Sequence, residues 1–198
     1  MTLSGGPEGQ LGSLEGDLLA LSMQYRERCS RLPLNDRKQT ALARLYAGAK
    51  RLREAVQEGA VAEAIVEIGS NLMGCEKMAL FLLREHWNTV LLLSSVGLRL
   101  EQIEAMHMNA RGIIEEAPAD IIYIESEAEK PDSFLSSLGV TAYVPFRLDD
   151  ETKGAIVFFD LLPQRNGMDM ADRELLNLLS AYAGRCLSAD KTKEEIAG

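Results

Sequence analysis

The chain has 198 residues, of which 46% are hydrophobic and 26% are charged, a composition typical of a folded globular protein and not of a disordered, collagen-like or disulfide-scaffold chain. Its formal net charge of −9 argues against nucleic acid as a partner, because phosphate binding needs a basic surface. No stretch approaches the roughly 18 consecutive apolar residues of a membrane span, and residues 1–16 lack the features of a signal peptide. We therefore expect a soluble, cytoplasmic protein without a membrane span.

The charge is unevenly distributed along the chain. Residues 1–60 carry 9 basic and 7 acidic side chains, a balance of +2, whereas residues 61–198 carry 12 and 23, a balance of −11. Opposite charges attract, so we expect the two parts to pair, either within one chain or between two chains.

The N-terminal 58 residues predict a tail followed by a helical arm. Residues 1–16 contain five glycines and one proline, which predicts a disordered tail. Residues 17–58 predict a helix, a break at Pro33 and a second helix. The second helix carries an apolar stripe at spacings of 3, 4, 3 and 4 residues, formed by Leu42, Leu45, Ala49, Leu52 and Val56.

The stripe has two interpretations. It could be a dimerisation element that makes the protein a homodimer, or it could be the inner face of an amphipathic helix that lies on its own domain. Two or so heptads are too few to decide between them. The helix is basic but lacks the Trp and Phe that anchor peripheral helices, which disfavours membrane binding.

Residues 60–189 predict a second unit in which the period of the apolar residues changes from helical to strand-like. Two hairpins require antiparallel pairing, so we expect an α/β (α+β) domain with a mostly antiparallel sheet of about five to six strands and flanking helices. Residues 190–198 are expected to form a flexible tail. The expected helical segments are 60–73, 100–108, 113–116, 131–138 and a last helix opened by Asp169, and the expected strands are 78–83, 90–95, 121–124, 142–148 and 155–162.

The unit resembles a GAF domain, a PAS-related sensory and regulatory fold. The motifs that carry the resemblance are Gly69-Ser70-Asn71-Leu72-Met73-Gly74-Cys75-Glu76, Val96-Gly97-Leu98, Ile121-Ile122-Tyr123-Ile124-Glu125, the run from Phe134 to Pro145, Gly154-Ala155-Ile156-Val157-Phe158-Phe159 and Asp172-Arg173-Glu174-Leu175-Leu176.

The resemblance implies a ligand pocket between one sheet face and the helical excursion. Sites of this shape are mostly apolar with a few placed polar groups. The pocket could bind an unidentified small molecule, or it could be filled by the chain's own side chains. The residues that the resemblance assigns to it are Met106, Ile113, Tyr123, Phe134, Leu138, Thr141 and Tyr143.

The residues give little support for the ligands that specialised GAF domains bind, which are cyclic nucleotides, bilins and haem. The Asn-Lys and Phe-Asp-Glu signature of cyclic-nucleotide-binding members is absent, and no Cys lies beside His107, as bilin attachment requires. A single helical His flanked by Met is a poor basis for haem. We therefore expect no cofactor and no metal.

Three cysteines leave one enzymatic alternative open. Free methionine sulfoxide reductases are GAF-like and use three cysteines around the pocket. In this chain Cys29 lies in the arm, Cys75 precedes the first strand and Cys186 lies on the last helix. Thiol chemistry needs a nucleophile and a resolving thiol that converge. We expect inert free thiols and no enzyme activity.

The sequence as a whole predicts a non-enzymatic regulatory module of the signalling type. It would dimerise through helices and either sense a small molecule or dock a protein partner of a signalling pathway; the alternatives are a ligand-free adaptor with a filled pocket and a thiol enzyme. A ligand would act by favouring one packing of the helices beside the sheet, within the limit of its differential affinity for the two states.

Overall fold

The computed structural model describes residues 7–31, 36–84, 89–108, 120–123, 140–148, 152–162 and 167–197. Within them, five strands form one antiparallel sheet in the order β2-β1-β5-β4-β3. The strands are β1 (Cys75–Arg84), β2 (Thr89–Val96), β3 (Ile122–Tyr123), β4 (Ala142–Arg147) and β5 (Thr152–Leu161). The helices are α1 (Pro7–Arg31), α2 (Asp36–Glu58), α3 (Val61–Glu67), the π-helical turn η1 (Ile68–Leu72), α4 (Leu100–Met108) and α7 (Met170–Ala197).

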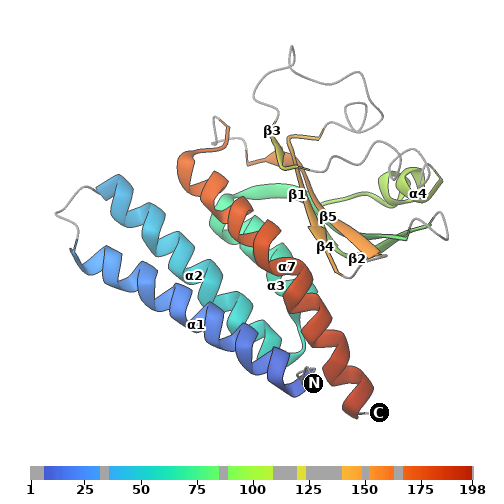
Figure 1. Cartoon of the computed structure of the whole chain (residues 1–198). Coiled ribbons are helices and arrows are strands. Elements are labelled where there is room, and N and C mark those ends of the chain that lie inside the picture. The colour runs from blue at the N-terminus through green and yellow to red at the C-terminus, as the bar shows by residue number, and fades with distance from the viewer. Residues whose placement is uncertain are drawn as a thin grey trace.

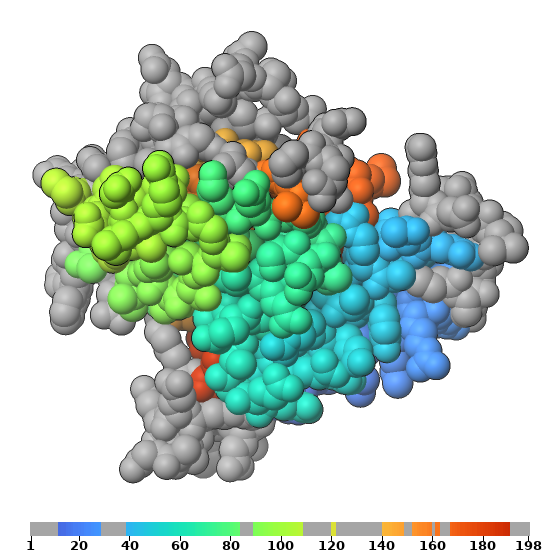
Figure 2. Space-filling model, turned by 180° about the vertical axis from the view of Figure 1, so that it is seen from behind, coloured from blue at the N-terminus to red at the C-terminus, as the bar shows by residue number. Residues whose placement is uncertain are grey.

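The helices form layers on one face of the sheet (Figure 1). The helices α3 and α7 and the turn η1 pack next to the strands, α2 packs behind them against α7 and α3, and α1 packs against α2 and α7. The remaining helix, α4, contacts the edge strand β2 and lies away from this helical layer (Figure 1). From behind, α4 and the α2–α3 region form adjacent parts of the surface (Figure 2).

The expected helices and strands are confirmed in type and order where they fall on described residues. Both hairpins are present, with β1 antiparallel to β2 and β4 antiparallel to β5. The strand expected over 121–124 is the two-residue β3, and the helix expected over 60–73 consists of α3 followed by the π-helical turn η1. The helical turns expected over 113–116 and 131–138 lie outside the described residues.

Side chains that alternate along the strands face the helical layer and form the first core. Met78, Leu80 and Leu82 of β1 are all buried in it. The intervening residues of β1 are buried on the opposite face. Burial on both faces explains why β1 is a continuous apolar run where a half-exposed strand would alternate with polar residues.

Helix α7 lies very close to β4. A Cβ atom at Gly184 would collide with the carbonyl oxygen of Arg147, so glycine is required for this approach. The hydroxyl of Ser180 donates a hydrogen bond of 2.9 Å to the carbonyl oxygen of Pro145, and that of Ser188 donates one of 3.0 Å to Leu148. Two hydroxyls of α7 therefore satisfy carbonyl groups at β4 and the turn that follows it, which fixes the helix along the strand.

Both predicted tails are wrong over most of their length. Residues 7–16 belong to α1 and residues 190–197 continue α7. Leu14 is buried in the first core with Leu18. Helix propensity alone disfavours a segment with several glycines, but burial of one apolar face provides the stabilisation that local propensity lacks.

The stripe on α2 faces inward and does not form an exposed dimerisation surface. Leu45, Ala49, Leu52 and Val56 are buried in the first core, and Leu42 is partly buried against it. The second interpretation, an amphipathic helix lying on its own domain, therefore holds for this stripe. The arm passes into the domain through one tight turn, in which Gly59 has φ +74° and its N–H donates to the carbonyl oxygen of Ala55 at 2.9 Å.

The expected attraction between arm and domain is confirmed within the chain. Arg51 of α2 donates a hydrogen bond of 2.7 Å to Glu67 of α3. The guanidinium of Arg185 on α7 lies 2.8 Å from the carboxylate of Asp17 on α1. The Arg51–Glu67 pair joins a basic group of the arm to an acidic group of the domain, as the charge imbalance predicts. In the Arg185–Asp17 pair the arm supplies the acidic group and the domain the basic one.

Candidate functional site

A second core lies on the sheet face opposite the first. It is formed by alternate residues of the strands together with one residue of α4 and one that precedes β4. Leu92 and Leu98 pack against it and are partly buried. The buried members of this second core are Ala79, Phe81, Leu83, Val90, Met106, Val140, Tyr143, Ala155, Val157 and Phe159.

The structure brings together two of the predicted pocket residues in this second core. Met106 and Tyr143 are only 2% and 1% exposed, although one comes from α4 and the other from β4. Tyr123 lies on β3, in register with Ala142, and its side chain is outside the described part of the structure. Ile113, Phe134 and Leu138 are also outside the described residues, so their assignment to the pocket stays a prediction.

Thr141 occupies the border of this region and has a structural partner. Its hydroxyl donates a hydrogen bond of 2.6 Å to the carbonyl oxygen of Phe159, and its N–H donates one of 2.7 Å to the carbonyl oxygen of Phe158. The residue therefore fastens the start of β4 to β5. With its hydroxyl proton directed to the backbone, Thr141 is a poor hydrogen-bond donor for a ligand.

The buried members of the second core are covered almost completely. Each of its ten buried residues is at most 5% exposed. These side chains therefore belong to the interior of the protein.

Among the described buried members of the second core, one ionisable group is present, and it is held neutral. Burial raises the pKa of the Tyr143 phenol well above its ordinary value of 10.0, because desolvation disfavours the phenolate. A general base or acid works best with a pKa near the operating pH. Tyr143 is therefore not tuned for proton transfer and contributes to packing.

Two of the three cysteines are buried in the first core, far from each other. Cys75 pairs with Leu161 at the start of β1, whereas Cys186 of α7 lies beside Gly184 and Ser188, which contact Arg147 and Leu148 at the end of β4. Through the sheet register, Arg147 lies level with Leu83, eight residues along β1 from Cys75, or about 26 Å. The side chain of Cys29 is outside the described residues.

Neither of these two thiols has the environment of a reactive cysteine. Burial raises the pKa of Cys186 from 9.0 to about 12, an effect that the neighbouring Arg185 opposes only partly. The Cys75 thiol donates to the carbonyl oxygen of Lys77 at 3.2 Å. Reactive cysteines have a lowered pKa and access to solvent, so Cys75 and Cys186 do not form a nucleophile and resolving pair.

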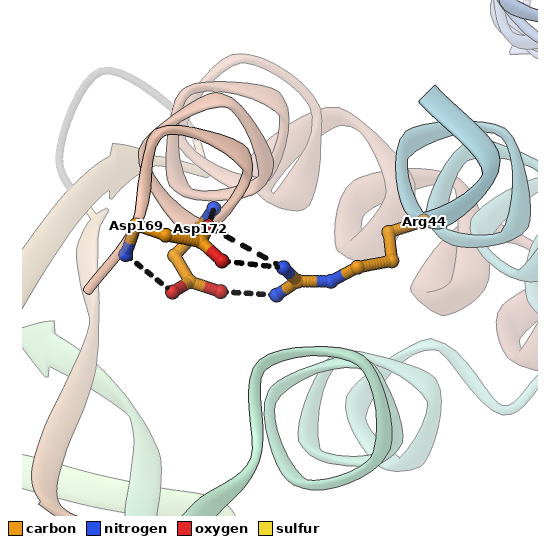
Figure 3. Close-up of polar contacts among 3 residues, drawn as sticks. All are labelled: Arg44, Asp169 and Asp172. Atoms are coloured by element: carbon orange, nitrogen blue, oxygen red, sulfur yellow. Dashed lines mark hydrogen bonds and ion pairs between the residues drawn. The ribbon is translucent and has the colours of Figure 1, made fainter. Parts of the chain in front are cut away.

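An ion-pair cluster with one buried carboxylate ties α2 to the start of α7 (Figure 3). The guanidinium of Arg44 lies 3.1 Å from the carboxylate of Asp169 and donates to Asp172, whose side chain is only 1% exposed. Asp172 accepts a hydrogen bond of 2.7 Å from the N–H of Asp169, and Asp169 accepts one of 2.8 Å from the N–H of Asp172. This reciprocal pair is a capping box at the N-terminus of α7, where negative charge is favourable.

Sequence reasoning identified Asp169 as the start of the last helix but missed its partner Arg44. The Asp-x-x-Asp spacing signals the capping box. No local signal links it to a basic residue 125 positions earlier, because that contact depends on how α2 packs against α7. The cluster has a structural role, since the guanidinium of Arg44 on α2 binds both carboxylates at the start of α7, while its buried Nε has no hydrogen-bond partner among the described residues.

Neither a metal site nor a membrane-spanning helix is found in the part of the chain that the structure describes. No group of three or more His, Cys, Asp or Glu side chains is placed to hold a metal ion there. No described helix combines the length and apolar character needed to cross a membrane.

Comparison with known proteins yields matches among solved structures only. No protein-family model matches the sequence, and no curated protein matches it. Among solved structures, the chain is similar to the GAF domain from Acinetobacter phosphoenolpyruvate-protein phosphotransferase, with a TM-score of 0.46 and 19% identity over 76% of this chain and 97% of that one. A likeness at this level carries no information about ligands, partners or activity, so the description of the fold rests on the strand order and the helical layers themselves.

Proposed function

We propose that this chain is a non-catalytic regulatory module that acts by binding other protein chains and whose second core is filled rather than open to a ligand. The observation that carries this proposal is the near-complete burial of all ten residues of the second core. A sensor of the same shape would need a cavity between the sheet and α4, and the burial of Met106 on α4 together with Tyr143 on the sheet supports a filled core instead.

The state of the ionisable groups supports the non-catalytic part of the proposal. Tyr143 is held neutral by burial, and Cys186 has a pKa of about 12. Neither group can supply a base or a nucleophile near neutral pH. The predicted thiol-enzyme alternative requires thiols that converge, and Cys75 and Cys186 lie at different ends of the sheet.

The helices that cover the first core support the proposal that protein partners regulate this chain. The first core is built from helices at both ends of the chain, and α1, α2 and α7 pack against one another as the helical layers on one face of the sheet. A partner that binds this layer can shift the packing of helices that are widely separated in sequence, by as much as its affinity differs between the packed states.

A cavity-creating variant provides the test of the filled core. The wild-type chain should bind neither benzene nor indole, measured as a shift in melting temperature and as added mass in native mass spectrometry. Phe81→Ala removes a ring from the second core and should create binding, because an engineered apolar cavity stays dry and accepts molecules of that size. Val157→Ala is the smaller variant if Phe81→Ala does not fold.

The outcome that overturns the proposal is a small molecule bound to the wild type. A stoichiometric adduct that survives buffer exchange, or a saturable thermal shift with either probe, would show that the second core opens. The sensor alternative would then replace the ligand-free module.

A further inference from the structure

The outer face of α1 carries an apolar stripe that the chain itself leaves uncovered. Gly12, Gly16, Leu19 and Met23 follow one another at spacings of 4, 3 and 4 residues, which places them on one side of a helix with about 3.6 residues per turn. All four are exposed, with Leu19 at 38% and Met23 at 60%. We call these four residues the outer α1 stripe.

The stripe lies on the opposite side of α1 from the residues that pack inward. α1 contacts α2 and α7, and in Figure 1 it is the outermost helix of the layer, on the far side of α2 from the sheet. The inward-facing residues of α1 that join or pack against the first core are Leu14, Leu18, Leu21 and Tyr25.

The described residues give the two glycines of the outer α1 stripe no packing role. A Cβ atom at Gly12 or Gly16 would meet nothing within 4 Å, so neither position needs glycine for packing. Glycine inside a helix is unfavourable relative to alanine, because it loses more backbone freedom on folding. Small residues at this spacing on an exposed face allow a second helix to approach closely, with larger side chains from that helix filling the space above them.

The distribution of charge along α1 is complementary to that of a second α1 helix running in the opposite direction. Residues 7–19 contain three acidic and no basic side chains, whereas residues 20–31 contain three basic and one acidic. Two copies of α1 packed antiparallel place each acidic half beside the basic half of the other copy, while a parallel pair would place like charges together.

We propose that the outer α1 stripe docks against the same stripe of a second copy of this chain, with the two α1 helices antiparallel about a two-fold axis. In this register Leu19 lies over Gly16 of the second copy and Met23 lies over Gly12, so that each large side chain meets a small one. The contact is isologous, as a two-fold axis requires. The inference rests on the proposed function, because it names the surface through which the regulatory module associates with itself.

Oligomeric state is the direct test. Analytical ultracentrifugation of the full chain at up to about 100 µM should show a dimer. Met23→Glu places a charge in the stripe, and Gly16→Leu fills the space that the second copy needs. Each should weaken the dimer by at least about tenfold in its dissociation constant. Gln24→Leu is the matched control, since it adds an apolar side chain at an exposed position of α1 away from the stripe and should leave the dimer unchanged.

The antiparallel orientation is tested by crosslinking in a Cys29→Ser background. A chain carrying Gly12→Cys mixed with one carrying Met23→Cys should form mixed disulfides faster than either forms disulfides with itself. Cys75 and Cys186 are buried in the folded chain. Circular dichroism and thermal melting of each variant establish that it is folded before its association is measured.

Several outcomes would overturn the inference. A wild-type monomer at about 100 µM, or a dimer that Met23→Glu and Gly16→Leu leave intact, would exclude the outer α1 stripe as the contact with a second copy. Faster self-crosslinking than mixed crosslinking would exclude the antiparallel arrangement. A wild-type monomer that also fails to bind benzene or indole overturns this inference alone, whereas a ligand-binding dimer overturns the filled core alone.

Discussion

The two faces of the sheet bury comparable side chains but are covered in different ways. The first core is closed by helices from both ends of the chain and is fixed by ion pairs and hydroxyl contacts between α7, α2 and β4. The second core, in its described part, is contacted by the short helix α4 and contains no charged residue among its buried members. The strand β1 therefore contributes side chains to both cores, and its consecutive residues stabilise opposite faces of the sheet.

The largest expected effect comes from a matched pair of leucines on β1. Leu80 is buried in the first core and Leu83 in the second, and each replacement by alanine should lower the free energy of unfolding by about 2–5 kcal/mol. If both cores are filled, the two losses should agree to within roughly 1 kcal/mol, because the cavity cost depends on how well the surroundings are packed. Chemical denaturation of both variants provides the measurement.

The two leucine variants can also contradict the interpretation that both cores are filled. A much smaller loss for Leu83→Ala than for Leu80→Ala would indicate that the second core is loosely packed and can adjust. The ligand-free interpretation would then lose its physical basis.

The next effect concerns the ion-pair cluster of the first core. Arg44→Met leaves the buried carboxylate of Asp172 without its guanidinium and should cost about 3 kcal/mol of unfolding free energy. Lys50→Met is the control on the same helix, because its pair with Glu54 is 3.6 Å long and both side chains are well exposed; its loss should stay below about 0.5 kcal/mol.

The double variant Arg44→Met with Asp172→Leu distinguishes pairing from packing. Removing both charges should recover much of the loss, because no unpaired charge remains buried. Equal instability of the double variant and Arg44→Met would mean that the cluster stabilises α7 through its capping box and not through the ion pair.

The smallest expected effect is a pH dependence from Cys186. Its pKa is raised from 9.0 to about 12 in the folded chain, so above pH 9 the unfolded thiol releases its proton while the folded one retains it. The folded state then binds more protons, and stability falls as pH rises from 9 toward 12. At pH 10 the loss relative to pH 8 should be about 1 kcal/mol.

Cys186→Val removes this titration while keeping a small apolar side chain in the first core. Its unfolding free energy should fall less than that of the wild type between pH 8 and pH 10. The same fall in both chains would assign the pH dependence to other groups.

The candidate site was only partly predictable. Met106 and Tyr143 were assigned to one region from a resemblance, and the structure does bring them together. Whether that region is open could not be predicted, since the same apolar residues can line a cavity or fill it, and only their packing in three dimensions distinguishes the two. Arg44 was missed because its partners lie 125 and 128 residues away.

The sequence by itself determined the type and order of the elements. Apolar periodicity distinguishes helix from strand locally, and the turn residues between 148 and 155 and between 84 and 89 specify hairpins over a few residues. The imbalance of charge along the chain likewise indicated that arm and domain attract each other, which the Arg51–Glu67 pair shows.

Only the tertiary structure decided which apolar stripe is internal and which is left exposed. The stripe of Leu45, Ala49 and Leu52 has the pattern of a dimer helix but is covered by the chain's own helices, whereas the glycine-rich start of α1 is folded because Leu14 and Leu18 are buried. Periodicity specifies that a helix has an apolar face, but what covers that face depends on contacts between residues far apart in sequence.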